Sequence, residues 1–152
     1  MEEESKTEGN SNRGRKNRAA GARFELKVRK DLEAKGWITD KWTKNVDLEK
    51  KELVPAKRKF NPFNRIMTIG TGFPDFIAFR PEMGTKKERF HRYNVMGVEA
   101  KSNGLLDKTE KEKCNFLLEQ NIFKDIRIAK KGKKRGEIEY IDFETKKSVD
   151  VF

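Results

Sequence analysis

The sequence predicts an α/β fold in which a mixed central sheet is flanked by helices. Two long helical patterns, over residues 18–35 and 107–121, alternate with shorter apolar stretches that are typical of strands. The predicted order is one helix, three strands, a second helix and two further strands, and such elements pack as helices against a mixed sheet. A chain of 152 residues buries one core of ordinary size. We therefore expect a single domain over residues 18–152.

Residues 1–17 are expected to form a disordered arm, because they are polar and charged with almost no apolar side chain. The later part of this arm is basic. The first helix is predicted from apolar residues at four-residue steps, which are Phe24, Val28 and Leu32. It is expected to end before Gly36, a residue that suits the position after a helix C-terminus. Residues 37–42 are predicted as a strand.

Residues 45–72 are predicted as irregular structure, because they contain two prolines and several asparagines. Basic residues are interleaved with aromatic ones here, as in a loop that faces nucleic acid. The basic residues are Lys57, Arg58, Lys59 and Arg65. A solvated loop pinned to the core by Phe60 and Phe63 explains the same pattern. Gly70 and Gly72 either let the backbone approach a phosphate or form an ordinary turn.

Residues 74–101 are predicted to form a β-hairpin whose charged turn spans residues 81–92. Side chains alternate along a strand, so Glu99 and Lys101 point to the same face. Asp75 begins the first strand, and antiparallel pairing brings it beside the Glu99 end of the second. An acid and an amine at the end of an apolar strand are costly to bury unless they are paired, hydrated or bound to a metal. Carboxylate oxygens suit a hard cation such as Mg²⁺.

The second helix is expected to begin with a capping box of Thr109 and Glu112. Its largely apolar face is marked by Cys114, Leu117, Leu118 and Asn121. Strands are predicted at 125–130 and 137–143, with a short edge strand within 146–152. The turn between the two longer strands is basic, and it either contacts DNA or lies in solvent. Its basic residues include Lys133, Lys134 and Arg135.

Pro74-Asp75, followed by Glu99-Ala100-Lys101, resembles the signature of the PD-(D/E)XK nuclease superfamily. The segment 21–25 at the start of the first helix is similar to that of archaeal Holliday junction resolvases, and the likeness runs over residues 18–121. Residues 43–70 are longer than a compact resolvase needs. The resemblance implies a restriction-endonuclease-like fold with Mg²⁺ or Mn²⁺ as cofactor. It implies a catalytic set of Glu25, Asp75, Glu99 and Lys101. The implied metal ligands are Asp75, Glu99, the Ala100 carbonyl and Glu25.

Each candidate residue has a structural alternative. Glu25 would pair with Arg29 one turn later on an exposed helix face. Asp75 would be a turn residue after proline, while Glu99 and Lys101 would form a charge pair at the end of a sheet. Further candidates for contact with nucleic acid or its phosphates are Arg18, Arg23, Ser102, Asn103, Lys113 and Gln120. The single histidine, His91, is expected at the surface of the hairpin turn.

The charge of the chain favours a polyanionic partner. Its 36 Lys and Arg against 25 Asp and Glu give a net charge of +11, which is typical of nucleic-acid-binding proteins but also of ribosomal and membrane-surface ones. One cysteine and one histidine exclude an internal disulfide and a Cys/His zinc cluster. The sequence contains no membrane-length apolar run and no signal-peptide core. We expect a cytoplasmic protein without membrane contact, compatible with an archaeal or viral origin.

Three functions agree with these features. The first is a structure-selective endonuclease for branched DNA, acting as a homodimer because two cuts at one junction need two active sites. The second is a less selective nuclease of the same superfamily that acts on flaps, ends or duplex DNA. The third is a basic DNA-binding protein whose acidic cluster is not catalytic.

Overall fold

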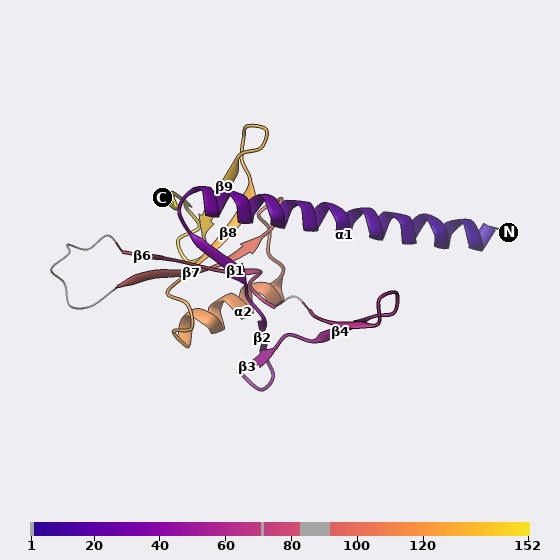
Figure 1. The fold of residues 1–152 in the computed structure, drawn as a ribbon, viewed down its shortest axis with the longest axis horizontal. Helices are drawn as coiled ribbons and strands as arrows, with labels where there is room; N and C mark the ends of the chain where they lie inside the picture. The colour runs from indigo at the N-terminus through magenta and orange to yellow at the C-terminus, as the bar shows by residue number, and fades with distance from the viewer. Residues whose placement is uncertain (1, 71, 83–91) are drawn as a thin grey trace.

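The computed structural model of the chain describes residues 2–70, 72–82 and 92–152 (Figure 1). Its main element is a six-stranded mixed sheet with the strand order β1-β6-β7-β8-β9-β10. The strands are β1 (Ile38–Lys41), β6 (Phe76–Pro81), β7 (Tyr93–Ala100), β8 (Asp125–Lys131), β9 (Ile138–Asp142) and β10 (Ser148–Val149). Neighbours pair antiparallel apart from β7 and β8, which run parallel. The predicted α/β class, the mixed sheet and these strand positions are confirmed.

Helix α1 (Glu2–Ala34) covers one face of the sheet with its C-terminal half. Phe24, Val28 and Leu32 are buried there, as their four-residue spacing predicts, and Gly36 follows the helix with a positive φ of 85°. The structure differs from the expected arm at residues 1–17, because it continues the helical backbone to Glu2. Residues 11–23 are exposed, so packing on the sheet does not account for this extension, and its residues 9–14 are mostly glycine, asparagine and serine, which are weak helix formers (Figure 1).

Helix α2 (Lys108–Glu119) connects the parallel strands β7 and β8 and covers the opposite face of the sheet. It buries Cys114 and Leu117, as predicted, but its capping box lies two residues earlier than expected. Asp107, rather than Thr109, accepts from the Glu110 N–H at 2.8 Å. The Glu110 carboxylate accepts from the Asp107 N–H at 2.9 Å. Asp caps a helix as well as Thr does, so the sequence alone allows both registers.

Two β-hairpins occupy residues 44–69, where irregular structure was predicted, so that prediction was wrong. They are formed by β2 (Lys44–Asp47) with β3 (Glu52–Pro55), and by β4 (Arg58–Asn61) with β5 (Ile66–Ile69). Pro55 ends a strand and Pro62 lies in a turn, so neither proline interrupts a ladder. The alternative in which Phe60 and Phe63 pin this segment to the core was also wrong, since these residues are 59% and 98% exposed.

Each face of the sheet has its own core. Alternate residues of β6 divide between them: Phe76 and Ala78 join the cluster under α1, whereas Ile77 packs in the cluster under α2. In β7, Met96 and Val98 also belong to the α1 side. Glu99 therefore faces α2, in agreement with the predicted alternation. The middle of the predicted hairpin turn, including His91, lies outside the described residues. No helix in the described ranges is long and apolar enough to cross a membrane.

Candidate active site

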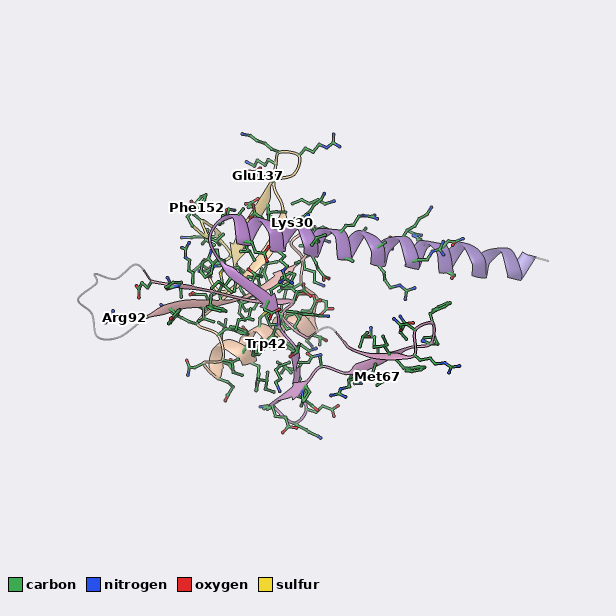
Figure 2. The ribbon with its side chains drawn as sticks, viewed as in Figure 1. Lys30, Trp42, Met67, Arg92, Glu137 and Phe152 are labelled. Carbon is green, nitrogen blue, oxygen red and sulfur yellow. The ribbon has the colours of Figure 1, made fainter. Side chains whose placement is uncertain are left out.

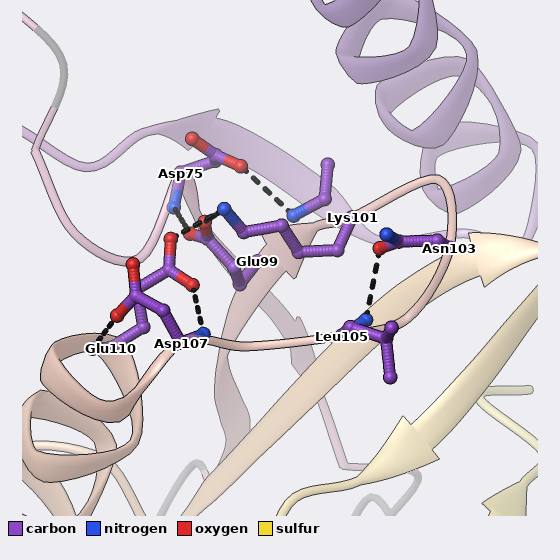
Figure 3. Close-up of polar contacts among 8 residues, drawn as sticks. Asp75, Glu99, Lys101, Asn103, Leu105, Asp107 and Glu110 are labelled. Atoms are coloured by element: carbon purple, nitrogen blue, oxygen red, sulfur yellow. Dashed lines mark hydrogen bonds and ion pairs between the residues drawn. The ribbon is translucent and has the colours of Figure 1, made fainter.

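The hairpin of β6 and β7 brings Asp75 and Glu99 together, as predicted. Phe76 pairs with Val98, which places Asp75 beside Glu99 at the same end of the hairpin. The Asp75 N–H donates to Glu99 Oε2 at 3.1 Å, and Asp75 Oδ2 accepts from the Ala100 N–H at 2.9 Å (Figure 3). Each carboxylate is thus held by the backbone of the other strand. Their side chains are fixed without help from solvent.

Two glycines allow the segment before Asp75 to approach its neighbours closely. A Cβ on Gly72 would lie 2.3 Å from the Trp42 carbonyl oxygen, and one on Gly97 would lie 2.9 Å from the Pro74 ring. Real Cβ atoms do not approach that closely, so a larger residue would move the chain. Gly72 was predicted either to approach a phosphate or to form an ordinary turn. Its backbone instead packs against the backbone of Trp42 and Lys44, which supports neither role.

Burial makes the two carboxyl groups hold protons more tightly than usual. It raises the pKa of Asp75 to about 6, an effect opposed by the Ala100 hydrogen bond and increased by the charge of Glu25. Burial and the adjacent Asp75 charge raise the pKa of Glu99 to about 9. Glu99 is only 5% exposed. Two buried like charges in contact are unfavourable, and a bound cation would relieve them.

Lys101 supplies a positive charge at the same place. Its Nζ lies 3.8 Å from Glu99 Oε1 and still closer to the Glu110 carboxylate (Figure 3). Burial by itself lowers the pKa of Lys101, but the hydrogen bond to Glu110 and the charges of Glu99, Glu110 and Asp75 outweigh it and raise the pKa. The side chain is therefore an ammonium at neutral pH, and it provides charge rather than acting as a general base.

The donor atoms fit a hard divalent cation in their chemistry. Asp75 and Glu99 offer carboxylate oxygens, and a strand residue directs its N–H and carbonyl to the same side, so the Ala100 carbonyl also faces Asp75. In the described part of the chain, no three acidic, histidine or cysteine side chains are grouped closely enough to hold a metal by themselves. The fit thus depends on two carboxylates, a main-chain oxygen and positions left for water or substrate.

These residues lie in a cavity of about 780 Å³ between α1, the end of β7 and the start of α2. Glu25 belongs to the α1 wall of this cavity, and its charge acts on Asp75. The alternative pairing of Glu25 with Arg29 does not explain its position, because Arg29 pairs with Glu33 at 3.0 Å. Ser102 and Asn103 also line the cavity. The four predicted catalytic residues therefore share one cavity, although Glu25 stands apart from the Asp75, Glu99 and Lys101 network.

The predicted nucleic-acid-binding residues divide into two groups. Lys113 lines the cavity, donates to Asn45 Oδ1 at 2.9 Å and lies over the Phe73 ring. The others are exposed on α1, on the β4 to β5 region and on the β8 to β9 turn. They are Arg18, Arg23, Lys57, Arg58, Lys59, Arg65, Lys133, Lys134 and Arg135. Gln120 caps the C-terminus of α2 through its backbone. Lys131, which precedes the basic turn, reaches the cavity wall.

Sequence reasoning missed the contribution of Glu110 and Asn45 to this site. Glu110 is the main partner of Lys101, and Asn45 holds Lys113. The sequence contained a signal for Glu110, because Asp107 and Glu110 also have capping-box spacing, which places Glu110 in the first helical turn beside the motif. Nothing in the sequence marks Asn45. Comparison of the chain with protein-family models, curated proteins and solved structures found no significant match.

Proposed function

We propose that the protein is a metal-dependent endodeoxyribonuclease with a PD-(D/E)XK-like active site in a restriction-endonuclease-like fold. The observation that carries this proposal is the contact of Asp75 with Glu99 and Ala100, together with the Lys101 ammonium, on the floor of an open cavity. A buried carboxylate pair with raised pKa values and an adjacent ammonium is an arrangement typical of a catalytic site.

Asp75, Glu99 and the Ala100 carbonyl would hold Mg²⁺ or Mn²⁺, with Glu25 beside them on the cavity wall. Such an ion polarises a phosphoryl oxygen and lowers the pKa of a bound water. The backbone hydrogen bonds of Asp75 and Glu99 keep both carboxylates in place before substrate arrives. Lys101 would stabilise the negative charge that grows on the phosphate, which a compact ammonium does well.

The substrate class follows from charge and shape. A net charge of +11 and exposed basic residues on α1, on the β4 to β5 region and on the β8 to β9 turn suit a polyanion larger than a nucleotide. We take branched DNA as the preferred substrate and a homodimer as the active form, with a role in DNA recombination or repair inside the cell. A less selective nuclease for flaps, ends or duplex DNA is the second candidate, since the same cavity would accept those phosphates.

The test is cleavage of labelled four-way junction, flap and linear duplex at one salt concentration, with Mg²⁺ or with EDTA. Salt is held constant because phosphate contacts depend strongly on it. We expect cutting with Mg²⁺ alone and its loss in Glu99→Gln and Lys101→Met. Matched controls on α2 are Glu112→Gln and Lys108→Met, which form an exposed pair. Tight binding without cutting in any divalent metal would favour the non-catalytic DNA-binding protein instead.

A further inference from the structure

The hairpin of β4 and β5, residues 58–69, forms a finger that projects from the body of the molecule (Figure 1). The acidic residues nearest to it along the chain are Glu52 and Asp75, so no negative charge lies within the finger itself. It carries Arg58, Lys59 and Arg65, all exposed. In a chain with 25 acidic residues, this local absence of acid makes the finger strongly positive.

The finger also exposes large apolar side chains. Phe60 pairs directly with Met67 across the two strands, and they are 59% and 54% exposed. Phe63 lies at the tip and is 98% exposed. The turn is held by asparagines, because Asn61 Oδ1 accepts from the Phe63 N–H at 3.0 Å and Asn64 Oδ1 accepts from the Ile66 N–H. An ordered tip that presents an aromatic ring to solvent indicates a binding surface.

The base of the finger is continuous with the candidate active site. A second cavity of about 650 Å³ is lined by Lys57 and Lys59 at that base. It shares Asn45, Thr109 and Lys113 with the wall of the first cavity. The two cavities therefore adjoin each other, and the second is lined by three lysines, the third being Lys113, and by the acidic residues Asp47 and Glu49. The finger extends to the same side of the body as the N-terminal half of α1 (Figure 1).

We propose that the finger binds DNA next to the phosphate at the active site and stacks Phe63 on a base that is exposed at a break in the duplex. This inference rests on the proposed nuclease function and specifies how branched DNA is selected. Aromatic rings stack on any unpaired base, while basic side chains bind the flanking phosphates. In a continuous duplex the faces of the bases are already stacked, and the ring gains little without unstacking them.

The test measures binding in EDTA, where cutting does not occur, by fluorescence anisotropy of a four-way junction and of a fully paired duplex of equal length. Phe63→Ala should weaken binding to the junction about five- to hundredfold, the range for loss of one stacked base, and leave the duplex within about twofold. The control is Phe152→Ala, which removes an exposed aromatic ring far from the finger residue Met67 (Figure 2). It should change neither affinity.

A second readout locates the contact. With 2-aminopurine at the branch point, wild type should quench its fluorescence and Phe63→Ala should not. Equal losses on junction and duplex, or no loss on either, would overturn the proposal. A lower oligomeric mass of Phe63→Ala in sedimentation would also overturn it, because the finger would then serve self-association. So would a Phe63→Ala variant that loses binding to anionic vesicles but keeps its affinity for DNA. Thermal unfolding checks that Phe63→Ala is folded, as its exposure leads us to expect.

These outcomes are separable from those of the nuclease proposal. A protein that never cuts DNA, but loses junction binding in Phe63→Ala, keeps the finger contact and loses the proposed catalysis. A protein that cuts junctions equally well with and without Phe63 keeps the catalysis and loses the finger contact.

Discussion

Lys101 at the end of β7 and Glu110 in the first turn of α2 form an ion pair that ties the candidate active site to the adjacent helix. Glu110 also belongs to the capping box of that helix, through the Asp107 N–H. One carboxylate therefore both supports the start of α2 and determines where the Lys101 ammonium lies. The two roles respond differently to substitution.

Glu110→Gln and Glu110→Ala should separate these roles. Glutamine keeps the capping hydrogen bond and removes the charge, whereas alanine removes both. We expect Glu110→Ala to lower the free energy of unfolding by about 1 kcal/mol, and Glu110→Gln by less, in urea denaturation. Both should slow any Mg²⁺-dependent cleavage at least about tenfold, equivalent to about 1.4 kcal/mol in the barrier. Glu112→Gln is the control. Full activity in Glu110→Gln would show that Lys101 needs no such partner.

The stability of the metal-free protein should fall as pH rises. Folding raises the pKa of Asp75 to about 6 and that of Glu99 to about 9, so the folded chain retains protons that the unfolded chain has released. The free energy of unfolding therefore decreases from about pH 4, where the unfolded carboxyl groups begin to release their protons, through about pH 9. Urea denaturation in EDTA at several pH values measures this slope. Glu99→Gln should flatten it, and Glu139→Gln, in a pair with Lys130, should not.

Divalent cations should stabilise the protein at alkaline pH. At about pH 8 a Mg²⁺ concentration ten times the dissociation constant would add about 1.4 kcal/mol to the free energy of unfolding. The effect is measured as a rise in melting temperature over a sodium chloride control of equal ionic strength. Asp75→Asn should abolish it, because one of the two carboxylates is lost. Asp125→Asn, which alters a carboxylate paired with Arg127, serves as the control. An equal rise in both variants would place the ion elsewhere.

The seating of α1 on the sheet should depend on its buried stripe. Leu32 is completely buried, so Leu32→Ala is expected to cost about 2–5 kcal/mol of unfolding free energy. Leu26 lies on the same helix and is 52% exposed, so Leu26→Ala should change the free energy of unfolding by no more than about 0.5 kcal/mol. Urea denaturation of both variants gives the comparison. Similar losses in the two variants would mean that the buried residues Phe24, Val28 and Leu32 do not hold the helix on the sheet, and so do not position Glu25 at the cavity.

Periodicity in the sequence was sufficient for most of the fold. The four-residue spacing of Phe24, Val28 and Leu32 predicted the packed part of α1. Alternation in 93–101 predicted that Glu99 lies on the face opposite Met96 and Val98. The segment 44–69 was mispredicted because prolines at strand ends and in turns look the same in a sequence as prolines in loops. Its two hairpins depend on which residues of the paired strands lie opposite each other, and the local sequence does not show this register.

The sequence by itself determined the chemical inventory of the site, since Asp75, Glu99 and Lys101 and the hairpin that joins them follow from local patterns. Only the tertiary structure decided how those groups are held. The tertiary structure pairs Lys101 with Glu110 and places Glu25 on the cavity wall. It also leaves the apolar side chains of the finger exposed. The physical reason is that strand alternation is set by the geometry of the backbone. Ion pairs and exposed apolar residues instead depend on which distant segments pack nearby.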